Sequence, residues 1–138
     1  MVLRKAIITS RLHAAVFDGN LNLVKQLLGD GGDATAMVPA FPLEANSSDV
    51  RIEQRKLLSV LIKAGADIDY VDWNAEEPST LLYRATTFKR HDLIEILHQA
   101  GADLDKICWR GQTALHGAMA IGRWDIARML VRMGADID

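Results

Sequence analysis

Four histidines and one cysteine are the side chains of this sequence best suited to catalysis or metal binding. His91, Glu95 and His98 are spaced i, i+4 and i+7, so a helix would place them on one face, where they could contact a metal ion. His98, however, falls in the apolar stripe of the expected helix, and His91 lies at the helix's outer start. We therefore expect neither a metal site nor a cofactor.

Cys108 has His116 eight residues downstream. A thiolate nucleophile needs a base within hydrogen-bonding reach and usually a third group that orients the base. His116 belongs to a repeated motif, described below, that gives it a structural role. The sequence also has no glycine-rich phosphate loop, nucleophile elbow or paired-cysteine motif. We expect Cys108 to be a turn or packing residue and the protein not to be an enzyme.

The composition is that of a globular protein, with 138 residues, 49% hydrophobic, 25% charged and three prolines. The net charge is −2, and lysines and arginines are spread among acidic residues, so we expect no nucleic-acid partner. Apolar runs fall far short of the roughly 18 residues that a membrane helix needs, and no secretion signal is recognisable. A single cysteine fits a reducing compartment. We expect an intracellular, cytoplasmic protein that is monomeric in isolation.

A repeat organises the sequence. Gly31, Gly65, Gly101 and Gly134 each follow a leucine-rich run, at spacings of 34, 36 and 33 residues. The last three glycines open Gly-Ala-Asp-Ile-Asp or Gly-Ala-Asp-Leu-Asp. Upstream of each glycine, positions spaced i, i+1, i+4 and i+5 are apolar in 15 of 16 cases, and His98 is the exception. This spacing forms one face of a helix, and the glycine suits the left-handed turn that ends it.

A second motif precedes that helix in three of the units. It reads Thr or Ser, one residue, Leu, His or Tyr, one residue, Ala, and it begins at Ser10, Thr80 and Thr113. The hydroxyl can cap a short first helix, and the alanine allows two helices to pack closely. Each unit is therefore predicted to be a short helix, a second helix with a buried stripe, a glycine and a short extended segment.

Together the two motifs resemble the ankyrin repeat, whose pattern is a turn, Thr-Pro-Leu-His-x-Ala-Ala, a Gly, a second helix and Gly-Ala-Asp. The resemblance covers nearly the whole chain and implies an all-α solenoid of stacked helix-turn-helix units with short β-hairpin-like fingers. Residues 1–138 would form one domain of four repeats, at about 4–33, 34–69, 70–105 and 106–138. The family resemblance also implies that His13 and His116 tie neighbouring backbone segments together.

Repeat two departs from the pattern, because its first half lacks the second motif. Pro39 and Pro42 interrupt regular structure there, so we expect an irregular segment over 36–53 and a longer second helix starting near Asp49. The apolar stretch at 36–43 either covers the gap left by the missing helix or forms an arm that docks a partner. Repeat three carries about three extra residues within 70–78, so its finger should be long.

The fingers and the ends of the first helices would remain free for recognition in such a solenoid. The candidate partner-binding residues at these positions are Trp73, Glu76, Glu77, Phe88, Trp109, Arg110 and Gln112. Tryptophan and arginine are enriched at binding hot spots, which favours the two finger tryptophans as anchors. Each of them could instead lie back over its neighbouring finger. Trp124 starts a second helix, where the family usually has Leu, and is expected in the core.

We therefore expect a non-enzymatic module that binds another protein through its concave and finger face. It would act as a blocker or scaffold, such as an inhibitor, an antitoxin-like protein or an adaptor. The alternative is a structural or targeting ankyrin fragment of a longer multidomain protein. That alternative rests on the sequence stopping at Asp138, where another finger would begin, without the polar capping helix that terminal repeats usually need.

Overall fold

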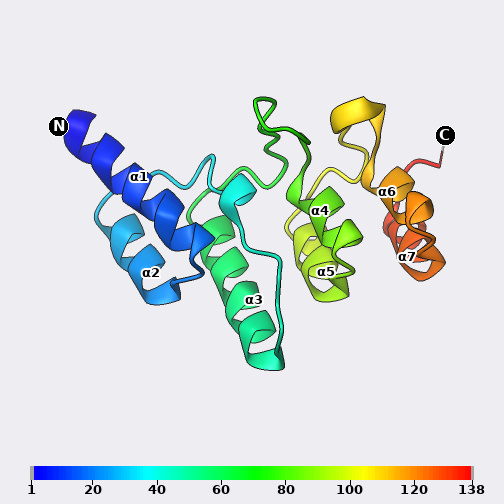
Figure 1. The fold of residues 1–138 in the computed structure, drawn as a ribbon, viewed down its shortest axis with the longest axis horizontal. Coiled ribbons are helices and arrows are strands. Elements are labelled where there is room, and N and C mark those ends of the chain that lie inside the picture. The colour runs from blue at the N-terminus through cyan, green and yellow to red at the C-terminus, as the bar shows by residue number, and fades with distance from the viewer. Residues whose placement is uncertain (1, 138) are drawn as a thin grey trace. The chain divides into compact units, whose positions relative to one another are not determined.

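The computed structural model describes residues 2–137, which form helices joined by turns, with no strand among them (Figure 1). Contacts divide the chain into two compact units, residues 1–67 and 68–138, which are described separately. The predicted all-α class is confirmed. The expected fingers are turns and a short 3-10 helix, without assigned strands in the described part. None of the described helices is both long and apolar enough to cross a membrane.

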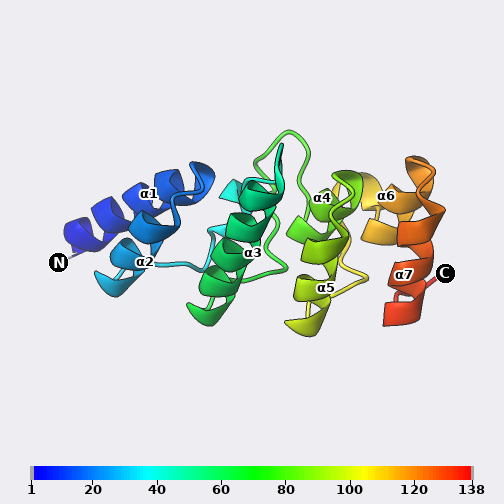
Figure 2. The ribbon, with the colours of Figure 1, turned by 90° about the horizontal axis from the view of Figure 1, so that it is seen from below.

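Repeat one consists of α1 (Val2–Phe17) and α2 (Leu21–Gly29), which lie side by side in Figures 1 and 2. Their interface buries apolar side chains such as Leu12 and Val24. The prediction of a short first helix capped by Ser10 is wrong here. The helix starts at Val2, so Ser10 lies inside it, where the backbone N–H groups already have helical partners.

Repeat two has a 3-10 turn, η1 (Val38–Ala40), in place of a first helix. Its second helix, α3 (Ser48–Lys63), is 16 residues long, and the Ser47 hydroxyl accepts the Val50 N–H at 3.3 Å to cap it. The predicted long helix is therefore confirmed. The side chains of the preceding stretch are buried, and Phe41 is only 1% exposed. Because η1 packs against α1, this stretch fills the gap left by the missing helix and is not a free arm.

Unit 2 contains two complete helix pairs, shown side by side in Figure 2. They are α4 (Leu81–Thr87) with α5 (His91–Gln99), and α6 (Ala114–Ala120) with α7 (Trp124–Met133). Thr80 caps α4 by accepting the Tyr83 N–H at 3.1 Å, and Thr113 caps α6 in the same way. Both caps were predicted from the second motif. The stripes of α5 and α7 supply the apolar core, as at Leu97 and Leu130.

The second aspartate of the Gly-Ala-Asp-x-Asp motif links successive repeats of unit 2. The Asp69 carboxylate accepts the backbone N–H of Asp103 at 2.9 Å, and Asp105 accepts that of Asp136 at 2.7 Å. In unit 1 the Asp67 N–H instead donates to the backbone carbonyl of Thr35, at 3.0 Å. The second aspartate of the motif thus supplies an acceptor for a backbone N–H in the turn one repeat later, where no helical carbonyl is available.

Candidate partner-binding surface

The finger of repeat three presents Trp73 to solvent. Asp72 closes a turn around it, because its carboxylate accepts the Asn74 N–H at 3.0 Å and its carbonyl accepts the Ala75 N–H at 3.0 Å. This local closure is the usual way in which an aspartate stabilises a turn. The indole is 60% exposed, and Glu76 and Glu77 beside it are exposed as well. Trp73 therefore stands away from the helix stack rather than packing over it.

The finger of repeat four holds its tryptophan differently. Trp109 begins η2 (Trp109–Gly111). Its backbone N–H donates to the carbonyl of Pro78 at 2.8 Å, and this bond connects the finger to that of repeat three. Arg110 takes a left-handed conformation with φ of 59°, and its Cζ lies 4.4 Å from the centre of the Trp109 ring. This is a cation–π contact. The half-buried indole is thus partly packed: it is neither a fully exposed anchor nor a ring that lies back over the neighbouring finger.

Two further candidates differ in how available they are. The hydroxyl of Tyr83 donates to Gln112 Oε1 at 3.0 Å, so part of the Gln112 side chain is already engaged within the fold. Phe88 follows α4 and is 46% exposed. The structure therefore brings Trp109, Arg110 and Gln112 together in one turn. Phe88 lies apart from that turn along the chain, directly after α4.

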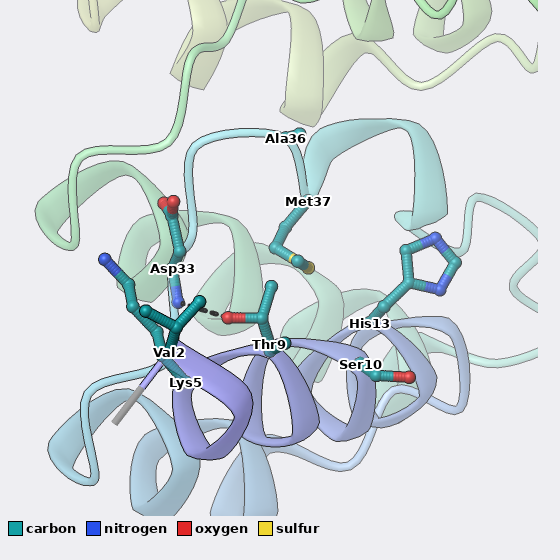
Figure 3. Close-up of a pocket in the computed structure, with 9 residues that line it drawn as sticks. Val2, Lys5, Thr9, Ser10, His13, Asp33, Ala36 and Met37 are labelled. Atoms are coloured by element: carbon teal, nitrogen blue, oxygen red, sulfur yellow. Dashed lines mark hydrogen bonds between the residues drawn. The ribbon is translucent and has the colours of Figure 1, made fainter.

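Unit 1 contains an open groove of about 870 Å³ between α1 and the segment that follows Gly32 (Figure 3). Its lining residues are Val2, Lys5, Ala6, Thr9, Ser10, His13, Asp33, Ala36 and Met37. The Asp33 N–H donates to the Thr9 hydroxyl at 3.2 Å and fixes the segment beside the helix. Sequence reasoning missed this groove. The signal was the run of small side chains on α1, Ala6 and Ser10, one turn apart beside His13.

The rim of the groove is polar and carries both signs of charge. The Thr35 hydroxyl donates to the Asp33 carboxylate at 2.6 Å and its N–H at 2.9 Å, and these bonds hold the pKa of Asp33 below its usual value. Lys5 adds a smaller lowering of that pKa from the same rim. The groove therefore offers a largely apolar floor with an anion and a cation at its edge.

Comparison with known proteins agrees with this repeated architecture. The family described as Ankyrin repeats (3 copies) matches residues 12–138. The chain belongs to the ankyrin-repeat family. It is also 29% identical over 127 residues to the transient receptor potential cation channel subfamily A member 1 of Homo sapiens. Those residues make up 92% of this chain and 11% of the channel protein, so the chain spans about a tenth of that relative's length. Ankyrin repeats are generally protein–protein interaction modules.

The two motif histidines of this ankyrin-repeat chain differ in role. The Thr113 N–H donates to His116 Nδ1 at 3.0 Å, which completes a capping box at the start of α6. His116 is therefore structural, although it closes its own helix rather than joining two segments. The same prediction is wrong for His13, whose exposed side chain lines the groove and makes no hydrogen bond with any described residue. It lies within α1, where helical bonding leaves no free N–H for the imidazole.

The prediction that Trp124 lies in the core is also wrong. Its side chain is 57% exposed at the start of α7. The corresponding residue of repeat three is His91, whose Nε2 lies 3.1 Å from the Asp125 carboxylate of repeat four. His91 is exposed as well, although repeat four contacts it, so this helix position lies outside the core in both repeats.

Cys108 and His116 are used in packing and hydrogen bonds. Within residues 2–137, no three His, Cys, Asp or Glu side chains are grouped so that they could hold a metal ion. Cys108 is 1% exposed, and the Thr80 N–H donates to its sulfur at 3.4 Å. His116 bonds Thr113 instead of approaching this thiol. Cys108 thus joins the finger of repeat four to the start of α4, consistent with a packing role.

Proposed function

We propose that this ankyrin-repeat chain binds another protein, without catalysing a reaction, through the fingers of repeats three and four, and so acts as a blocker or scaffold. The supporting observation is the exposed indole of Trp73 at the tip of a turned finger. A structured turn holds this large aromatic side chain in water, and burial of its apolar surface by a partner would be favourable. Its surroundings, Glu76 and Glu77, supply a polar rim.

Trp109 and Arg110 make the second contact. Arg110 already stacks on the indole, so both side chains would lose less conformational freedom on binding than free side chains do. Truncation of an aromatic anchor commonly costs about 2 kcal/mol or more, roughly thirtyfold in affinity. Exposed charges such as Glu76 should change the association rate more than the affinity. The two tryptophans therefore carry most of the expected binding energy.

The groove of repeat one is a further surface of the same kind. Its volume of about 870 Å³ and its apolar floor would accept part of a peptide chain, with Lys5 and Asp33 at the rim as hydrogen-bonding partners. We propose it as a recognition surface of unit 1, in addition to the finger surface of unit 2. A carboxylate and an ammonium group at one rim favour a polar peptide backbone over a purely apolar ligand.

The test begins with a partner isolated by affinity capture and then expressed on its own. Calorimetry compares its affinity for the wild type, Trp73→Ala and Trp109→Ala, and we expect each substitution to weaken binding at least tenfold. Ile52→Ala is the matched control, because Ile52 is an exposed apolar residue of α3 and belongs to neither finger. If both tryptophan variants melt cooperatively and bind within about twofold of wild type, the finger proposal is wrong.

The alternative function is that of a structural or targeting segment of a longer protein. It is favoured by the channel relative, of which the matched region is only 11%. Immunoblotting of the natural source distinguishes the two, because this chain alone has a mass of 15.2 kDa. We also propose an intracellular location and a monomeric state in isolation, which fits a buried free thiol; sedimentation of the purified chain tests the latter.

A further inference from the structure

The two finger tryptophans occupy equivalent places in repeats three and four. Each lies eight residues after the glycine of the preceding Gly-Ala-Asp motif. Each is also the second residue of a turn, 72–75 for Trp73 and 108–111 for Trp109, in which the last backbone N–H donates to the first carbonyl at 3.0 and 3.2 Å respectively. The two rings therefore start from the same position in their fingers, and the difference between them comes from the neighbouring residues.

Trp109 already holds a cation, whereas Trp73 does not. The guanidinium carbon of Arg110 lies 4.4 Å from the centre of the Trp109 ring, and Arg110 adopts a φ of 59° in this arrangement. The equivalent residue of repeat three is Asn74, which carries no charge and is not among the non-glycine residues of 2–137 with a positive φ. No cation or ring of the described residues stacks on the Trp73 indole. The same kind of ring is therefore open in repeat three.

The extra length of the third finger consists largely of carboxylates. The capping threonine follows the end of the turn after five residues in repeat three, at Thr80, and after two in repeat four, at Thr113. Three residues are therefore extra, and two of them are Glu76 and Glu77. Both are exposed, and neither forms an ion pair within residues 2–137. The longer finger thus places two carboxylates without cations next to the open indole.

The charge of the third finger sets it apart from the fourth. Residues 68–80 contain four acidic side chains and no Lys, Arg or His, whereas the equivalent residues 104–113 contain one acidic side chain and two cations. The carboxylates of Asp69 and Asp72 also accept backbone N–H groups at 2.9 and 3.0 Å, so these two have a role inside the fold. A surface of one sign attracts the opposite charge and repels its own. The third finger therefore favours a cationic group and disfavours an anionic one.

We infer that Trp73 binds an arginine side chain of a partner protein. The guanidinium stacks on the indole, as Arg110 does on Trp109, and its N–H groups donate to the carboxylates of Glu76 and Glu77. Arginine suits this site better than lysine, because a planar guanidinium can stack on a ring and donate hydrogen bonds from its edge at the same time. The inference rests on the proposed function, in which the fingers bind a protein, and it names the residue that the third finger recognises.

Three short capped peptides test the inference on the whole chain. They are identical except at their central residues, which are arginine, citrulline or lysine. Citrulline keeps the planar shape of arginine without its charge. Calorimetry measures their affinities, and NMR follows the indole N–H signals of the three tryptophans. We expect the arginine peptide to bind about tenfold more tightly than the citrulline peptide, and more tightly than the lysine peptide, because the charge supplies both the cation–π contact and the ion pairs. It should shift the signal of Trp73 and leave that of Trp109, which Arg110 already covers.

Two sets of variants separate the ring from the carboxylates. Trp73→Leu keeps an apolar side chain but removes the aromatic face, so its affinity for the arginine peptide should fall about tenfold, to that of the citrulline peptide. The double change Glu76→Gln and Glu77→Gln keeps hydrogen-bond acceptors but removes both charges. It should slow association of the arginine peptide and weaken the dependence of its binding on salt.

Trp124→Leu is the matched control, because Trp124 is 57% exposed, close to the 60% of Trp73, but the carboxylate that follows it, Asp125, is already held by Arg123. This variant should bind the arginine peptide as the wild type does. All variants are compared by thermal melting, and the glutamine variant keeps the test decisive if Trp73→Leu unfolds.

Several results would overturn the inference. They are equal affinity for the arginine peptide and either of the other two, no binding of the arginine peptide, a shift confined to the other tryptophans, or undiminished binding by a folded Trp73→Leu variant. The inference and the proposed function can also fail separately. A captured partner that loses affinity for Trp73→Ala, but keeps its affinity when its own arginines are replaced, leaves the finger proposal standing and overturns the assignment to arginine.

Discussion

At the scale of single residues, Tyr83 and Gly117 depend on each other. Tyr83 stands where two other repeats have histidine, and its hydroxyl reaches Gln112 of the next finger at 3.0 Å. A Cβ atom on Gly117 would lie 2.9 Å from Cε2 of that ring, closer than real Cβ contacts. The larger ring in α4 is therefore accommodated by the missing side chain in α6.

Gly117→Ala should lower the free energy of unfolding by about 1–2 kcal/mol, despite alanine's better helix propensity, because the ring must shift and lose its bond to Gln112. Chemical denaturation measures the change. The double variant Tyr83→His and Gly117→Ala gives these two positions the residue types that repeat one has at the equivalent places, His13 and Ala14, and should lose less than the sum of its single changes. Additive losses would show that the two sites do not interact.

Asp125 should make the stability of unit 2 depend on pH in the acid range. The hydrogen bond from Arg123 holds the pKa of its carboxyl well below the ordinary value; desolvation opposes it, and a hydrogen bond from His91 adds a smaller lowering. A carboxyl with a lowered native pKa stabilises the fold above its unfolded pKa, near 3.9, and loses that contribution as the pH falls toward the native pKa. Asp125→Asn should therefore lower Tm at pH 6, and the difference from wild type should shrink below pH 4. Melting curves recorded across this range test the prediction, and a difference that does not change with pH contradicts it.

At the scale of elements, the stretch at 37–43 replaces a whole helix. Phe41, at 1% exposed, fills the space where the first helix of repeat two would pack. Phe41→Ala should cost about 3–5 kcal/mol, the usual loss for a large buried side chain and the cavity it leaves. Urea denaturation measures it, and Trp73→Ala, which alters an exposed ring, should stay within about 0.5 kcal/mol of wild type. A loss below about 1 kcal/mol for Phe41→Ala would mean that the stretch is a loosely held cover.

The second helices could be predicted from the sequence because their buried stripes and terminal glycines recur in phase. The start of α1 could not, since Val2 to Ile8 contain no capping residue and match no repeated motif. Because α1 begins eight residues before Ser10, His13 lies inside the helix and lines the groove, instead of joining neighbouring backbone segments. Trp124 was expected in the core because the ankyrin family usually has Leu at that position, but His91 and Trp124, which occupy it in repeats three and four, are both exposed. The groove depends on the turn after Gly32, which no sequence pattern revealed.

At the scale of the whole molecule, the chain offers two chemically different kinds of surface. The fingers present aromatic rings with polar neighbours, which suits recognition of a partner's loops or side chains. The groove of repeat one presents an apolar floor with a carboxylate and an ammonium group at its rim, which suits a peptide segment. In a protein whose repeats contact only their neighbours, binding at an end adds stability there first. The two proposed contacts should therefore differ in their effect on the melting of the chain.

The reaction of Cys108 with a thiol reagent can report how often the finger of repeat four opens. Its sulfur, 1% exposed beneath the Thr80 N–H, is the only thiol of the chain, so a thiol reagent modifies the protein at one site and only when that finger lifts away. If lifting is local, the modification rate of the unaltered protein should change little with dilute urea; if it requires global unfolding, the rate should rise as steeply as the unfolding constant does. A partner that clamps Trp109 should slow the modification further, and its affinity can then be measured from a reaction rate without replacing any residue.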